Sequence, residues 1–243
     1  RDTDRSRGLG DVYKRQNQSN AVEFCRRHIL PPEKEVVLHG AGVDLNRYIY
    51  TPYTAHDPPR FLFVGRLMRE KGVEELFCAM RRLWTEGFHV HLQLLGFFEE
   101  QYRQEVDRLV AGGMTEFFGF QKEPLSFYQN CDCVVLPSYH EGMSNVLLEA
   151  AAVGRPIIAS DIPGCREAVE HSKTGLLCRA KDADSLYVAM RAFLALSAEQ
   201  KAALGQNGRR KMEREFDKAS VVAETLRIVT AEKAAPQPRR VTA

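Results

Sequence analysis

From residue 60 onward, short apolar runs alternate with longer segments in which apolar residues recur at helical spacing. The short runs occupy 60–65, 91–95, 115–118, 133–137, 156–160 and 175–178. The first of them, RFLFVG (60–65), is a continuous apolar run, which is typical of a strand buried on both faces. The helical segments occupy 70–85, 99–110, 124–130, 145–153, 182–196, 198–215 and 217–231. The alternation predicts an α/β fold, a doubly wound, Rossmann-like parallel sheet with helices on both faces.

The chain before residue 60 has a different character. Residues 1–15 show no hydrophobic period, and we expect them to be a non-native or disordered leader. Residues 16–59 contain a short helical pattern at 20–28, a strand at 36–39, a glycine-containing turn at 40–44 and a proline-containing segment at 50–60. We interpret 16–59 as the end of a preceding domain and an interdomain linker. The main domain is then 60–232, and 233–243 is a polar tail expected to be disordered.

Composition narrows the function classes. The hydrophobic content of 44% in 243 residues is enough for a large core. The formal net charge of +2 comes from residues 1–15, and the remainder has equal numbers of acidic and basic side chains. A neutral body argues against a nucleic-acid partner, which would require clustered basic residues. Cys131 and Cys133 flank a single residue inside an apolar run, so we expect buried thiols rather than a zinc site.

The sequence predicts a cytoplasmic protein. Its start is polar, and no apolar run approaches the ~20 residues that a membrane span needs. Reduced cysteines in apolar runs are also typical of that compartment.

The loop after the first strand, GRLMREKG (65–72), contains three basic residues, of which Arg66 and Lys71 are the candidate phosphate ligands. Ligands of doubly wound sheets bind at the carboxyl ends of the strands. Gly65 would let the backbone turn tightly, and Arg66 and Lys71 would offer a diphosphate two positive charges beside a helix N-terminus. A solvated charged turn would have a similar composition, and neither a P-loop nor a dinucleotide glycine pattern is present.

The segment after the fourth strand, PSYHEGMSNVLLEAAAVGRP (137–156), contains two carboxylates around a helix start. Ser144 is placed to be the N-cap of the helix, whose first amides would attract a phosphate. Glu149 lies about one turn inside this helix and Glu141 lies in the loop before it. Glu149 could be an ordinary charge on an amphipathic helix. However, its neighbours are almost all apolar or small, so its carboxylate needs a partner.

These segments resemble the retaining glycosyltransferases of the GT-B fold, in family 4. The resemblance rests on EGMSNVLLEAAAVGRPIIASDIPGCREAV, in which seven residues separate Glu141 from Glu149, on GRLMREKG and on the turn HGAGVDLNRY (39–48). It covers about residues 16–229 and identifies the C-terminal, donor-binding domain. The detail DIPGCREAVEHSKTGLL resembles bacterial enzymes of polysaccharide synthesis.

The resemblance implies a role for each residue. Arg66 and Lys71 would bind the donor diphosphate and stabilise charge on the departing nucleotide, and Glu141 would contact the sugar. Glu149 would bind the ribose. The donor site would comprise Gly65, Ser144, Asn145, Val146, Leu147 and Glu149. The donor would be a UDP-sugar, with no cofactor and no metal. The adjacent His140 would either reach the site or be structural.

The expected reaction is a retaining hexosyl transfer to a saccharide or polyprenyl-linked acceptor in surface polysaccharide synthesis. Peripheral contact with the inner face of the membrane is compatible with this reaction. An N-terminal domain would complete the cleft, so the isolated chain is expected to be inactive and its last helix to expose an apolar face. Two alternatives stay open at this point: a nucleotide-binding module without chemistry, and a sugar-nucleotide epimerase on the same architecture.

Overall fold

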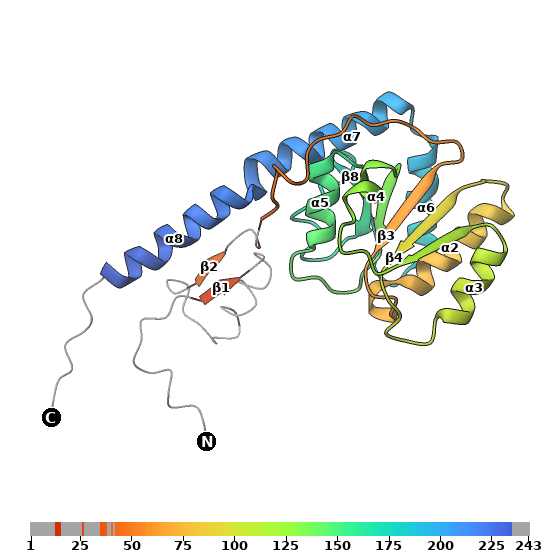
Figure 1. Cartoon of the computed structure of the whole chain (residues 1–243), viewed down its shortest axis with the longest axis horizontal. Coiled ribbons are helices and arrows are strands. Elements are labelled where there is room, and N and C mark those ends of the chain that lie inside the picture. The colour runs from red at the N-terminus through yellow and green to blue at the C-terminus, as the bar shows by residue number, and fades with distance from the viewer. Residues whose placement is uncertain (1–12, 16–25, 27–34, 38–39, 41, 235–243) are drawn as a thin grey trace, which may run out of the picture.

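Six parallel strands form the central sheet of the computed structural model, which describes residues 13–15, 26, 35–37, 40 and 42–234. The strands are β3 (Arg60–Val64), β4 (His91–Leu95), β5 (Thr115–Gly119), β6 (Cys133–Leu136), β7 (Ile157–Ser160) and β8 (Gly175–Cys178). Their spatial order is β5-β4-β3-β6-β7-β8 (Figure 1). This order reverses direction between β3 and β6, as in a doubly wound sheet. The predicted fold class is therefore confirmed.

Helices cover both faces of the sheet. They are α2 (Val73–Thr85), α3 (Arg103–Ala111), α4 (Leu125–Gln129), α5 (Asn145–Val153), α6 (Ala183–Ala195), α7 (Ala198–Lys211) and α8 (Lys218–Ala234). On one face α2 packs against α6, and on the other α5 packs against α4 and α7 (Figure 1). Right-handed crossovers that leave β3 and β6 in opposite directions place α2 and α5 on opposite faces. The N-termini of α2 and α5 thus flank the point where the strand order reverses.

Two helices start later than their sequence pattern predicts. The segment 70–85 begins with a 3₁₀ turn, Arg69–Lys71, and α2 follows only after Gly72. Gly72 has φ = 70°, and a Cβ at this position would lie 2.1 Å from the carbonyl oxygen of Pro137. The approach of Pro137 therefore interrupts the helix. The segment 99–110 is helical only from Arg103, because Glu99 and Glu100 form a turn beside the loop after β3.

The chain enters and leaves the sheet domain at one place. Val43 forms a parallel bridge with Asp217: its amide donates to the Phe216 carbonyl at 2.8 Å, and its carbonyl accepts from the Lys218 amide at 3.0 Å. The predicted helix 198–215 ends as α7 at residue 211, and a π turn, Met212–Phe216, leads to this bridge. Beyond the bridge, α8 runs away from the sheet domain (Figure 1).

Apolar side chains are exposed on α8. Val222 and Leu226 both face solvent in the chain as described. This agrees with the expectation of an uncovered apolar face on the last helix.

A buried arginine joins the linker to the sheet domain. Arg155 is 1% exposed and donates to the carbonyls of Tyr128 at 2.9 Å, Gln129 at 2.9 Å and Thr51 at 3.0 Å. These acceptors lie on α4 and on the linker. Arg155 thus fixes both segments relative to α5.

Short strands also occur ahead of the linker. β1 (Tyr13–Arg15) pairs in parallel with β2 (Glu35–Val37), which differs from the expectation of a leader without regular structure. β2 corresponds to the strand predicted at 36–39. The helix predicted at 20–28 lies outside the described residues except for Arg26, which is helical, and 235–243 lie outside them as well.

Candidate functional site

A half-buried ion pair joins the two loops that carry the predicted site residues. The Lys71 ammonium lies 2.6 Å from Oε1 of Glu141, and the two side chains are 20% and 11% exposed. Lys71 comes from the turn after β3 and Glu141 from the loop after β6, which are adjacent strands at the centre of the sheet. The sequence placed both residues at this edge but did not predict that they form a pair.

Two close backbone approaches hold this pair in place. The amide of Tyr139 donates to the carbonyl of Glu70 at 2.8 Å, and Gly72 lies against Pro137. On the other side, Gly164 has φ = 89°, and a Cβ there would lie 2.4 Å from the Glu141 carbonyl oxygen. The loop after β7 therefore packs directly on the backbone of Glu141.

The second predicted cation, Arg66, is also paired with a carboxylate. Its Nη1 lies 2.7 Å and 3.0 Å from the two carboxylate oxygens of Glu99, and both side chains are exposed. The role of Glu99 was not predicted, because the pattern places this residue in a helix. Gly65 lies at the bend directly after β3, but a Cβ there would meet only the Phe63 ring, at 3.4 Å. The neighbouring position 96 does require a glycine, because Gly96 has φ = 144° and a Cβ there would lie 1.8 Å from the Gly65 carbonyl oxygen.

The N-terminus of α5 lies in the same region, but its predicted cap works differently. Ser144 occupies the N-cap position, yet its side chain makes no capping hydrogen bond. Its carbonyl instead accepts from the Leu147 amide at 3.1 Å, so that amide is already engaged within the helix. Among the first-turn amides, those of Asn145 and Val146 are the better placed to receive an anion.

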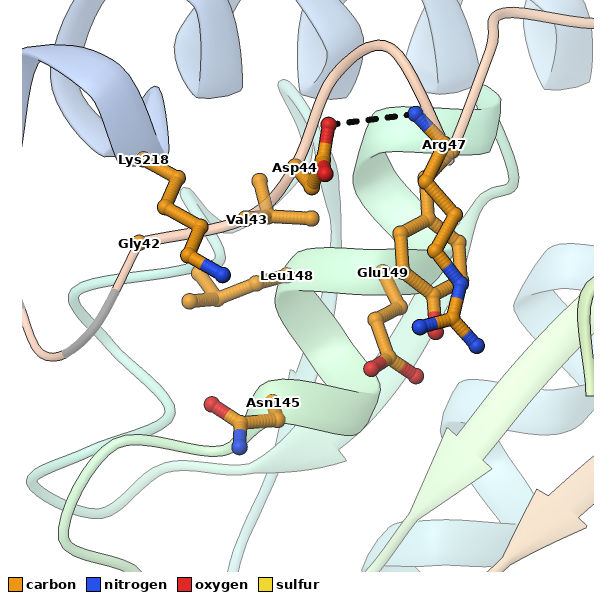
Figure 2. Close-up of a pocket in the computed structure, with 9 residues that line it drawn as sticks. Gly42, Val43, Asp44, Arg47, Asn145, Leu148, Glu149 and Lys218 are labelled. Atoms are coloured by element: carbon orange, nitrogen blue, oxygen red, sulfur yellow. Dashed lines mark hydrogen bonds between the residues drawn. The ribbon is translucent and has the colours of Figure 1, made fainter. Parts of the chain in front are cut away.

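Glu149 faces a cavity of about 220 Å³ between α5, the linker and the start of α8 (Figure 2). The cavity is lined by Gly42, Val43, Asp44, Arg47, Tyr48, Asn145, Leu148, Glu149 and Lys218. Oε2 of Glu149 accepts a hydrogen bond from the Tyr128 hydroxyl at 2.9 Å, and the Tyr48 side chain lines the same cavity. Burial raises the pKa of Glu149, while the hydroxyls of both tyrosines and the nearby Arg47 lower it. The carboxylate thus has the partners that its surroundings require.

A second, more apolar pocket of about 170 Å³ lies at the carboxyl ends of β3 and β4. It is lined by Val64, Gly65, Arg66, Leu95, Gly96, Phe97, Phe120 and Gln121. Phe97 and Phe120 are both exposed, which is unusual for large aromatic side chains. This pocket was not predicted, although aromatic residues directly after two strands were a signal for it.

The remaining predicted features are placed as follows. His140 is exposed. Four cysteines are buried free thiols, namely Cys131, Cys133, Cys165 and Cys178, and burial raises the pKa of Cys131 to about 12. The described residues include no cluster of three or more His, Cys, Asp or Glu side chains suited to a metal ion. Within the same part of the chain, no helix is both long and apolar enough to cross a bilayer.

Solved structures show where this architecture is found. The structure is similar to that of sucrose-phosphate synthase from Thermosynechococcus elongatus, with a TM-score of 0.78 at 26% identity, covering 92% of this chain and 58% of the other. It is equally similar to Anabaena HepE in complex with UDP, with a TM-score of 0.78 at 19% identity, covering 91% and 64% of the two chains. These neighbours are GT-B glycosyltransferases, so the GT-B assignment of the fold is confirmed.

Sequence relatives point the same way. The chain is 31% identical over 226 residues to a glycogen synthase of Mycobacterium tuberculosis, covering 86% of this chain and 52% of the relative. It is 31% identical over 182 residues to N,N'-diacetylbacillosaminyl-diphospho-undecaprenol alpha-1,3-N-acetylgalactosaminyltransferase of Campylobacter jejuni, covering 70% and 47%. The chain thus spans about half the length of these curated relatives. Residues 52–211 match the family described as Glycosyl transferases group 1, and the chain belongs to that family.

Proposed function

We propose that this chain is the donor-binding part of a retaining glycosyltransferase that transfers a hexosyl group from a nucleotide diphosphate sugar. The observation that carries the proposal is the Lys71–Glu141 pair, at 2.6 Å, beside the N-terminus of α5 where the strand order reverses. A diphosphate needs cations and amide donors, and both converge there. The retaining outcome rests on the resemblance of the 141–149 segment to family 4.

The donor fits this edge of the sheet in four parts. The diphosphate lies between Lys71, Arg66 and the first turn of α5, and the sugar extends toward Glu141. The ribose lies against Glu149, whose carboxylate opens into the cavity of Figure 2. The apolar pocket beside Phe120 offers the base a planar neighbour. A uracil base is favoured by HepE, a structural neighbour that was solved with UDP and with UDP-glucose.

Carboxylates hold both phosphate-binding cations before the donor arrives. Glu141 orients Lys71 and Glu99 orients Arg66, so neither cation must be ordered at the moment of binding. As the bond from the sugar to the diphosphate breaks, negative charge grows on the departing nucleotide. Positioned cations stabilise that charge more than they stabilise the ground state.

The acceptor side of the cleft belongs to an N-terminal domain in this proposal. The acceptor is a saccharide or a polyprenyl-linked saccharide of surface polysaccharide synthesis, in line with the lipid-linked substrate in the name of the Campylobacter jejuni relative. The reaction takes place in the cytoplasm, with peripheral contact at the inner face of the membrane. The exposed Val222 and Leu226 of α8 are where the N-terminal domain is expected to pack.

The test separates the two glutamates by the part of the donor that each contacts. In the full-length protein, Glu149→Gln should weaken binding of both UDP and the UDP-sugar. Glu141→Gln should spare UDP binding and lower the rate of transfer. Calorimetry with UDP and turnover of radiolabelled UDP-sugar measure the two effects. Reversal of the two phenotypes would exchange the assignments, and normal binding and turnover in both variants would refute the transferase proposal.

A further inference from the structure

Two tyrosines from separate parts of the chain lie beside Glu149. Tyr128, at the end of α4, is completely buried and donates to Oε2 of Glu149 at 2.9 Å. Tyr48, in the linker, is 6% exposed and lines the same cavity as Glu149. The two rings meet edge to face with their centroids 6.2 Å apart. The mechanism proposed above uses neither tyrosine.

The choice of a phenol as partner has a chemical consequence. A salt bridge would neutralise the carboxylate and weaken it as an acceptor, whereas a neutral hydroxyl orients it and leaves its charge in place. Arg47, which lines the same cavity, is held at 2.5 Å by Glu123. Burial raises the pKa of Tyr128, so its hydroxyl stays protonated and acts as a donor.

The geometry points to Tyr128, against whose ring Tyr48 packs, as a positioning residue that aims Glu149 at the ribose and thereby sets a preference for ribonucleotides over deoxyribonucleotides. This inference rests on the proposed function, in which Glu149 binds the ribose. With Oε2 held by Tyr128, the carboxylate presents its remaining lone pairs to the cavity. A ribose with both hydroxyls can use them, and a deoxyribose forgoes one of the two bonds.

The experiment is a double-mutant cycle in which one hydroxyl group is removed from the protein and one from the ribose of the ligand. The 243-residue chain is titrated with UDP, 2′-deoxy-UDP and 3′-deoxy-UDP, and binding is followed by NMR chemical shifts, which suit weak affinities. The variants are Tyr128→Phe, Tyr48→Phe and Glu149→Gln. The matched control is Tyr187→Phe, since Tyr187 makes an equivalent phenol–carboxylate contact with Glu86, on α6 and away from the cavity.

We expect the unmodified chain and the Tyr187→Phe control to bind UDP about tenfold more tightly than at least one deoxy analogue, as for a hydrogen bond to a charged group. Tyr128→Phe should lower the affinity for UDP about fivefold and leave the affinity for that analogue within about twofold. Tyr48→Phe should show a smaller loss of the same kind. A merely structural role would lower the affinities for all three ligands equally.

Two results would overturn the inference and can be told apart. If Glu149→Gln removes the preference for UDP while both Tyr→Phe variants keep it, Glu149 binds the ribose without help from the tyrosines, and the proposed function stands. If Glu149→Gln keeps the preference, the ribose assignment itself is wrong, and this inference falls with it.

Discussion

Replacing Lys71 with methionine would separate the two roles of the Lys71–Glu141 pair. The change removes the positive charge, keeps the length of the side chain and leaves the Glu141 carboxylate, 11% exposed, without its counter-ion. Exposed ion pairs contribute about 0–1 kcal/mol, whereas breaking a buried pair costs about 3–5 kcal/mol. The intermediate burial of this pair therefore predicts a loss of about 2 kcal/mol. For a chain of this size such a loss lowers Tm by roughly 4–8 °C.

The loss of turnover in free-energy terms should be larger than the loss of stability, and a second substitution at Glu141 should not reverse it. Loss of one positioned donor typically removes about 2.7–4 kcal/mol of transition-state stabilisation, so kcat should fall by about 10²–10³. In Lys71→Met/Glu141→Gln the unpaired carboxylate is gone, and the double variant should recover most of the lost Tm. It should not recover kcat, because the diphosphate still lacks its cation.

Calorimetric melting of the chain and transfer by the full-length protein measure these two quantities. Arg66→Met serves as the comparison, since the Arg66–Glu99 pair is exposed on both sides and its loss should cost no more than about 1 kcal/mol of stability. Wild-type melting of Lys71→Met would refute the electrostatic reasoning. So would a double variant that stays as unstable as the single one.

Three further changes test other parts of the structure. Gly72→Ala should destabilise the chain by at least about 2 kcal/mol in urea unfolding, because it combines a left-handed φ of 70° with a clash against Pro137. Glu149→Gln should raise Tm at neutral pH: burial raises the pKa of Glu149, so its ionised form destabilises the folded state, and the gain should shrink as pH falls through that raised pKa. Arg155→Lys should cost about 3 kcal/mol or more in urea unfolding, because an ammonium cannot span the three carbonyls that the planar guanidinium reaches.

The parts of the fold that were predicted are those that local patterns determine. Short, mostly apolar segments predicted all six strands of the main sheet, and a run of apolar and small residues predicted α5. The missed details depend on segments far apart in the sequence. The residues around Gly72 in the sequence do not indicate that Pro137 packs against it. Those around Glu99 do not indicate that it pairs with Arg66.

The same limit applies to the candidate site. The sequence indicated that Glu149 needs a partner, because apolar neighbours surround it. It could not name Tyr128, which donates from α4, or Tyr48, which packs against the Tyr128 ring from the linker. Residue types at a strand end predict which chemistry is present, whereas the hydrogen-bond partners depend on the tertiary packing.

The bridge between Val43 and Asp217 makes the sheet domain a module with a single junction. Both hydrogen bonds of the junction join main-chain atoms, and they need a glycine beside them: Gly42 has φ = 69°, and a Cβ there would lie 2.8 Å from the Phe216 carbonyl oxygen. The segment matched by the family, 52–211, lies wholly between these two residues. A relative's domain grafted at the same two residues would rebuild this junction only with a glycine at position 42. In the function proposed above, exchanging this module between relatives would change the donor site and leave the acceptor side of the protein unchanged.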